Sequence, residues 1–173
     1  MVIKNINKLV RGEYRMKIYV KPDNVIDYAV SELKDNILKI KYSNNINEST
    51  WDNVANGDFE KIKDSIPKKD NIYVIMIKVK TKTKIFDEDT NYYEVKYIGK
   101  SYNIRKRLRN HLVCKSKKTS SCLQHVKDYV LCSSTKEVYI STIEVIPREL
   151  NSYVESLLLK QFNSKNVWYT RKS

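Results

Sequence analysis

Two side chains, at residues 107 and 111, are suited to phosphate chemistry. Apolar residues recur at helical spacing over residues 104–112, which predicts a helix. Arg107 and His111 lie four residues apart in this segment, so they share one face beside the apolar stripe. The planar guanidinium of an arginine donates two hydrogen bonds to a phosphate at once. Two ordinary boundary residues would show the same spacing, but we favour an arginine and a histidine presented together at the rim of a cleft.

A carboxylate falls inside the apolar arc of the last predicted helix, residues 148–162. Glu155 lies among the apolar residues of this arc, which are Val154, Leu157, Leu158, Leu159 and Phe162. An ionised carboxylate that is buried without a partner is costly. A structural arginine or lysine, a raised pKa or a divalent cation would each satisfy it. Taken alone, Glu155 favours a salt bridge; beside a basic surface, the divalent cation is equally well supported.

The basic residues are concentrated in one part of the chain. The 173-residue sequence holds 33 Lys and Arg against 20 Asp and Glu, a net charge of +13. Residues 1–70 carry 13 basic and 11 acidic side chains, whereas residues 71–173 carry 20 and 9. The segment Val95–Lys127 contains ten Lys and Arg and no acidic residue. This distribution predicts a polyanionic partner, most often nucleic acid, although a basic protein that merely stays soluble is the alternative.

Two segments of the sequence resemble the signature of the GIY-YIG endonuclease family. The second half of the signature is matched by Tyr97-Ile98-Gly99-Lys100, Asn103-Ile104-Arg105-Lys106-Arg107-Leu108 and His111. Asn71-Ile72-Tyr73 resembles the first half, with Asn71 where the family has glycine. Glu155 matches the family's metal-binding carboxylate, and residues 119–123 resemble a segment common in phage and mobile-intron members. The resemblance covers residues 71–168.

The resemblance implies a phosphodiesterase that cuts double-stranded DNA with Mg²⁺ or Mn²⁺ as cofactor. Tyr73 and Tyr97 would lie side by side on paired strands, and one of them would activate the attacking water. Arg107 would hold the scissile phosphate, and Glu155 would be the sole protein carboxylate on the cation. His111 would assist proton transfer or position the water.

Further contacts to DNA are expected from basic and amide side chains. Lys100 would lower the pKa of a tyrosine or contact phosphate, and the other expected DNA-binding residues are Arg105, Lys106, Arg109 and Asn166. Asn163 is the alternative to Asn166 for the late asparagine of the family. The two signature tyrosines are 24 residues apart, longer than is usual in the family, so Tyr92 and Tyr93 are the alternatives to Tyr73.

The elements that must position these residues are predicted by the hydrophobic pattern. Strands over residues 72–80 and 91–99, the second ended by Gly99, form an antiparallel hairpin. Asn103 is suited to cap the helix that follows, and a second helix, 122–131, a strand, 137–145, and the helix 148–162 complete a β-β-α-α-β-α order. We therefore expect an α+β fold with a small, mainly antiparallel sheet flanked by helices. Residues 71–173 form the nuclease domain.

Residues 1–70 form an N-terminal α/β extension that we expect to serve DNA recognition or dimerisation. It contains predicted helices over 24–38 and 51–66, with a loop over 42–50. Cleavage of both DNA strands needs two active sites or sequential nicking, so a homodimer is one arrangement that we expect.

The leading hypothesis is a site-specific DNA endonuclease that resembles the type II restriction enzymes. A phage or intron-associated homing endonuclease is the second reading, an incision module of nucleotide-excision repair the third, and a non-catalytic basic DNA-binding protein the alternative from another class. No apolar run reaches the length of a membrane span, and the first residues lack a secretory signal. Reduced thiols are expected at Cys114, Cys122 and Cys132, which lack zinc-binding spacing, so we predict a cytoplasmic protein.

Overall fold

The protein is built on one four-stranded sheet. A computed structural model describes residues 25–68, 71–82, 89–113 and 121–162. Its strands are β1 (Leu38–Lys41), β2 (Asn71–Lys82), β3 (Asp89–Ser101) and β4 (Glu137–Ile143). They lie in the order β1-β4-β2-β3, and every neighbouring pair is antiparallel. The predicted α+β class, with a small antiparallel sheet flanked by helices, is confirmed.

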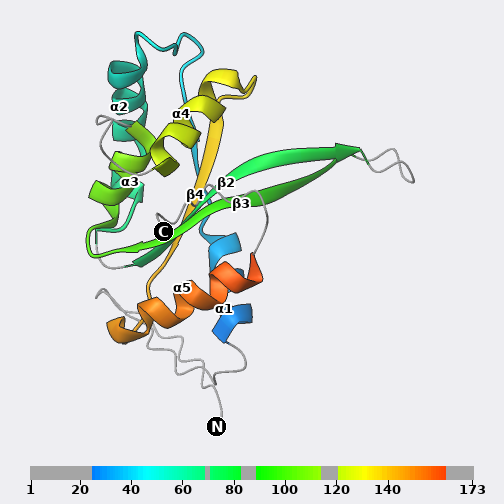
Figure 1. Ribbon diagram of the computed structural model, residues 1–173, viewed down its shortest axis with the longest axis vertical. Helices are drawn as coiled ribbons and strands as arrows, with labels where there is room; N and C mark the ends of the chain where they lie inside the picture. Colours follow the sequence, from blue (N-terminus) through cyan, green and yellow to red (C-terminus); the bar gives the residue numbers. More distant parts are fainter. Residues whose placement is uncertain (1–24, 69–70, 83–88, 114–120, 163–173) are drawn as a thin grey trace, which may run out of the picture.

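Helices cover both faces of this sheet (Figure 1). They are α1 (Val25–Asp35), α2 (Trp51–Ile62), α3 (Ile104–Val113), α4 (Ser121–Cys132) and α5 (Asn151–Gln161). Short 3₁₀ turns follow α2 at Lys63–Ser65 and precede α5 at Arg148–Leu150. None of the helices in the described ranges is long and apolar enough to cross a membrane.

The hydrophobic core consists of two clusters, one on each face of the sheet. Tyr73, Ile75 and Tyr97 belong to the cluster that packs against α2, α3 and α4. Ile72, Val74 and Ile98 belong to the cluster on the other face, with α1 and α5. Because successive side chains of a strand point to opposite faces, one run of β-branched residues supplies both clusters.

The hairpin of β2 and β3 reaches beyond the rest of the sheet (Figure 1). The two strands pair from Asn71↔Ser101 to Lys82↔Asp89, with an irregularity between Ile75 and Met76. Strand β4 pairs with β2 only between Ile72 and Met76, so no third strand among the described residues lies beside the outer half of the hairpin. The predicted antiparallel hairpin is confirmed, but β3 continues two residues past Gly99, to Ser101. Residues 83–88, within the segment 81–90 expected to hold the hairpin turn, lie outside the described residues.

The part of the chain before residue 71 adds a strand to the same sheet. The predicted helix over 24–38 ends earlier, at Asp35, and β1 follows it with Leu38 and Ile40 facing inwards and Lys39 and Lys41 outwards. Strand β1 pairs with β4, and Trp51 of α2 packs in the cluster that contains Tyr73. The described residues before and after position 71 therefore share one sheet and both core clusters. A role of this part in DNA recognition or dimerisation stays a prediction.

The helix that carries Arg107 and His111 forms as the sequence predicts. Its apolar stripe, Ile104, Leu108 and Leu112, is fully buried. Asn103 caps the first turn, because its Oδ1 accepts a hydrogen bond of 3.0 Å from the backbone N–H of Lys106.

Candidate active site

Four of the predicted site residues come together on the α3 face of the sheet. The Oη of Tyr73 and the Nε2 of His111 share a hydrogen bond of 2.9 Å. Arg107 Nε donates to the same oxygen at 3.4 Å. The ring centroids of Tyr73 and Tyr97 are 5.8 Å apart, and those of Tyr97 and His111 are 4.9 Å apart. We call these four residues the polar cluster.

The expected pairing of Tyr73 with Tyr97 is therefore present, and the alternatives lie elsewhere. Tyr92 and Tyr93 stand on the outer half of the hairpin and are 46% and 43% exposed. Tyr93 packs edge-on against Tyr139, with ring centroids 5.0 Å apart. The long hairpin thus leaves the signature tyrosines side by side, because its additional residues extend outwards.

Gly99 lets the Tyr73 ring lie across strand β3. The two residues are direct partners in the strand register. A Cβ atom at position 99 would lie 2.6 Å from Tyr73 Oη and 2.8 Å from Tyr97 Cε1. Atoms do not approach a Cβ so closely, so any larger residue at position 99 would require the tyrosine rings to shift. The sequence pattern marks Gly99 only as part of a motif and as the end of a strand. Its position two residues after Tyr97, on the same face of that strand, is the signal of this role.

His111 is more deeply buried than the sequence suggests. It was expected at the rim of a cleft, but its side chain is fully buried, because the sheet and neighbouring helices enclose this face of α3. Burial, and then the positive charge of Arg107, lower the pKa of His111 to about 3. The imidazole is therefore neutral at neutral pH, and its Nδ1 has no hydrogen-bond partner among the described residues.

Tyr73 and Arg107 keep their ordinary protonation. Burial, and then the proximity of Tyr97, raise the pKa of Tyr73 well above its usual range, against the opposing effect of Arg107. Burial alone would lower the pKa of Arg107, but its hydrogen bonds and attraction to Tyr73 and Tyr97 raise it. The cluster at rest thus contains a phenol, a neutral imidazole and a guanidinium cation. The expectation that Lys100 lowers a tyrosine pKa does not hold for Tyr73.

Lys100 and Glu155 form a second group, which joins the end of β3 to α5. Lys100 Nζ lies 3.0 Å from Glu155 Oε2 and donates a hydrogen bond of 2.6 Å to Ser152 Oγ. The Glu155 side chain is 20% exposed and that of Lys100 is 40% exposed. Of the partners that the sequence left open for Glu155, the structure supplies a lysine.

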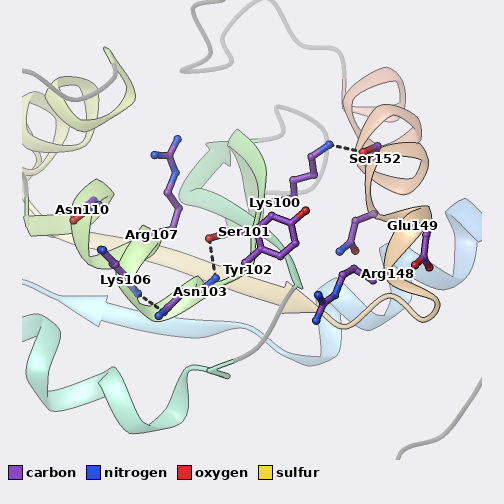
Figure 2. A pocket seen from close by; sticks show the side chains of 11 residues that line it. Lys100, Ser101, Tyr102, Asn103, Lys106, Arg107, Asn110, Arg148, Glu149 and Ser152 are labelled. Carbon is purple, nitrogen blue, oxygen red and sulfur yellow. Dashed lines mark hydrogen bonds between the residues drawn. The ribbon is translucent and has the colours of Figure 1, made fainter.

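A pocket of about 700 Å³ lies where α3, the end of β3 and the start of α5 meet (Figure 2). Arg107 of the polar cluster and Lys100 of the second group both line it, whereas Glu155 is not among its lining residues. Its charged lining residues are Lys100, Lys106, Arg107, Arg148 and Glu149. With four basic side chains against one acidic side chain, the pocket is suited to an anion such as a phosphodiester.

The oxygen atoms on α5 fit a hard divalent cation. Asn151 lines the pocket one helical turn before Glu155, and its buried Oδ1 has no hydrogen-bond partner among the described residues. Mg²⁺ prefers oxygen ligands and is usually held by one or two carboxylates together with waters and substrate phosphates. Glu155 could bind it if Lys100 released the carboxylate and kept its bond to Ser152. A cluster of three or more His, Cys, Asp or Glu side chains does not occur in the described ranges.

Two arginines expected to bind DNA are engaged on the other side of α3. Arg105 Nε donates to the carbonyl of Ile66 at 2.6 Å, and its Nη1 pairs with Asp64 at 3.2 Å. Arg109 Nε donates to Asn56 Oδ1 at 3.2 Å and lies 3.8 Å from Glu60 Oε1. These contacts join α3 to α2 and the turn after it.

The remaining predicted site residues have different outcomes. Lys106 lines the pocket, and its assignment to DNA binding stays a prediction. Asn163 and Asn166 lie outside the described residues, as does Cys114. Cys132 is free and exposed.

Comparison of the chain with protein-family models, with curated proteins and with solved structures finds no significant match.

Proposed function

We propose that this protein is an endonuclease that hydrolyses phosphodiester bonds in double-stranded DNA with Mg²⁺ or Mn²⁺, in the manner of the type II restriction enzymes. One observation carries the proposal. Side chains from two strands and a helix, Tyr73, Tyr97, Arg107 and His111, meet at one point beside a basic pocket. A surface that only binds DNA through its phosphates would not require a buried histidine joined to a buried phenol.

Arg107 connects the polar cluster with the substrate. Its Nε donates to Tyr73, while the side chain also lines the pocket, so the guanidinium can contact a phosphate there. Because the cluster holds this cation at a defined place before substrate arrives, it can stabilise the negative charge that develops on the phosphate. Lys100 and Lys106 add positive charge on either side.

Tyr73 and His111 form a hydrogen-bonded pair behind Arg107. Burial raises the pKa of Tyr73 and lowers that of His111, so both side chains are neutral at rest and share the 2.9 Å hydrogen bond. An imidazole with so low a pKa is a weak base, so we assign this pair the task of holding Tyr73 Oη and the Arg107 guanidinium in place.

Glu155, with Asn151 one turn earlier, would hold the divalent cation. When bound, the cation supplies Lewis-acid polarisation of the phosphate and the leaving oxygen. A homing endonuclease would use the same residues in the same way. A homodimer would provide the two sites that cleavage of both strands requires, and cytoplasmic DNA would be the substrate.

The competing function is a non-catalytic DNA-binding protein. The Lys100–Glu155 ion pair favours it, because a carboxylate satisfied by lysine needs no cation.

The test is incubation of the purified protein with plasmid and phage DNA, with Mg²⁺ or with EDTA. Discrete fragments that require Mg²⁺ support a site-specific endonuclease, and a smear supports a nonspecific one. Intact DNA with a mobility shift would replace the proposal by the binding function.

A further inference from the structure

An exposed aromatic ring stands inside the basic pocket. Tyr102 lines the pocket at the end of β3 and is 79% exposed, more than any other large apolar side chain in the described ranges. Figure 2 shows it between the side chains of α3 on one side and Arg148 on the other. A ring that is so exposed adds little to core packing, and it is accessible to a ligand in the pocket.

The backbone on both sides of Tyr102 is held in place. Ser101 Oγ accepts a hydrogen bond of 3.2 Å from the backbone N–H of Asn103. The Asn103 side chain in turn caps α3. The guanidinium carbon of Arg148 lies 5.6 Å from the centroid of the Tyr102 ring, within the range of a cation–π contact. These contacts therefore hold the Tyr102 ring in one position in the pocket.

The combination of an exposed ring with surrounding cations matches the chemistry of a nucleotide. Proteins that bind single strands hold the backbone in a positively charged groove and stack bases on aromatic side chains. Lys100, Lys106 and Arg107 supply the charge here, and Tyr102 supplies a face. The bases inside a duplex are stacked on both faces, so the ring can stack only on a base that has left the helix.

We propose that Tyr102 stacks on an unpaired nucleobase, and that the pocket binds DNA in which one nucleotide is single-stranded or extruded. If the bound phosphodiester is also the one that is cut, the inference rests on the proposed nuclease function. The stacking is independent of that function, because it is argued from the exposed ring and the basic lining of the pocket.

The test is DNA binding in EDTA, measured by fluorescence anisotropy on two 20-base-pair probes of the same sequence. One is a continuous duplex, and the other carries an unpaired 2-aminopurine in a single-nucleotide bulge. We compare the wild-type protein with Tyr102→Ala and Tyr102→Phe. The matched control is Tyr153→Ala, which removes another exposed tyrosine, 48% exposed on α5 and not part of the pocket lining.

Tyr102→Ala should weaken binding of the bulged probe about tenfold and of the duplex less than about twofold, because only stacking is lost. Tyr102→Phe and Tyr153→Ala should bind both probes like the wild type. The 2-aminopurine fluorescence should fall on binding to the wild type and remain unchanged with Tyr102→Ala. Equal affinities of Tyr102→Ala and wild type for the bulged probe, or an equal loss on both probes, would overturn the inference.

Failure of this inference is separable from failure of the nuclease proposal. If the wild-type protein cuts plasmid but shows no Tyr102-dependent preference for the bulged probe, the endonuclease proposal stands and the stacking site is refuted. If the protein cuts no DNA but shows this preference, the endonuclease proposal is refuted and the stacking site stands.

Discussion

The rings of the polar cluster are buried, whereas the pocket beside it is open to solvent. In the cluster, burial leaves His111 neutral and keeps Tyr73 a phenol, and short contacts hold the rings in one arrangement. The pocket is open and basic, and it presents Tyr102 to solvent. A buried cluster and an open pocket can therefore serve separate tasks. Substitutions in the cluster should alter the rate of chemistry or the stability, whereas those in the pocket wall should alter DNA affinity.

The largest effect is expected at Glu155, which belongs neither to the polar cluster nor to the lining of the pocket. Glu155→Gln should reduce cleavage to background while leaving DNA affinity in EDTA nearly unchanged, because the metal ligand is lost and the phosphate contacts remain. The measurement is single-turnover cleavage over a range of Mg²⁺ concentrations. Glu149→Gln, at the acidic residue that lines the pocket, is the control. If Glu149→Gln abolishes cleavage and Glu155→Gln does not, the metal ligand is wrongly assigned.

Arg107 belongs to both regions, so its removal should affect chemistry more than binding. Arg107→Ala should slow single-turnover cleavage by about 10²-fold or more, as the loss of other transition-state donors does. Arg109→Ala is the matched control, because this arginine of the same helix contacts Asn56 and Glu60 instead of the pocket. An unchanged rate for Arg107→Ala would refute its role in the transition state.

Burial of His111 should make the protein sensitive to mild acid. The pKa of His111 is near 3 in the folded protein against 6.5 for an unperturbed histidine, so below about pH 6.5 the unfolded state binds more protons. This contribution to stability is complete above pH 6.5 and is lost as the pH falls towards 3, by about 2 kcal/mol at pH 5. Urea unfolding at pH 7 and pH 5 measures it, and His111→Gln should lose that part of the pH dependence. Identical pH dependence in the variant would show that His111 is not the group responsible.

The two described glycines offer a comparison of a crowded and an open position. Gly99→Ala should destabilise the protein by about 1–3 kcal/mol, because the added methyl group meets the rings of Tyr73 and Tyr97. Gly57→Ala, in α2 with no atom within 4 Å of the added Cβ, should stabilise it by about 0.5–1 kcal/mol. Urea unfolding measures both. A Gly99→Ala protein as stable as the wild type would mean that the tyrosine rings move aside easily.

The smallest effect is expected at the pocket wall. Lys106→Ala should weaken DNA binding uniformly across sequences and reduce the slope of log affinity against log salt by about 1, because one phosphate contact is lost. Affinity at several salt concentrations measures it. A slope that does not change would remove Lys106 from the DNA contacts.

The order of the elements and the local pattern of the site could be predicted from the amino-acid sequence. Periodicity is a local property, so it predicted the β-β-α-α-β-α order, the buried stripe of α3 and the Asn103 cap. It also placed Arg107 and His111 on one helix face. It missed β1, because the four residues 38–41 are too few to show a period and become a strand only by pairing with β4.

The tertiary structure alone decided which partners these residues have. Glu155 is 55 residues from Lys100 in the chain, and Arg105 is 41 residues from Asp64, so no local pattern relates them. The burial of His111 and the crowding at Gly99 likewise depend on the ring of Tyr73, which belongs to β2 and lies far from both residues in the sequence. Electrostatics and packing act through space, whereas periodicity is a property of neighbouring residues along the chain. The contacts of a site assembled from two strands and two helices therefore depend on the tertiary structure.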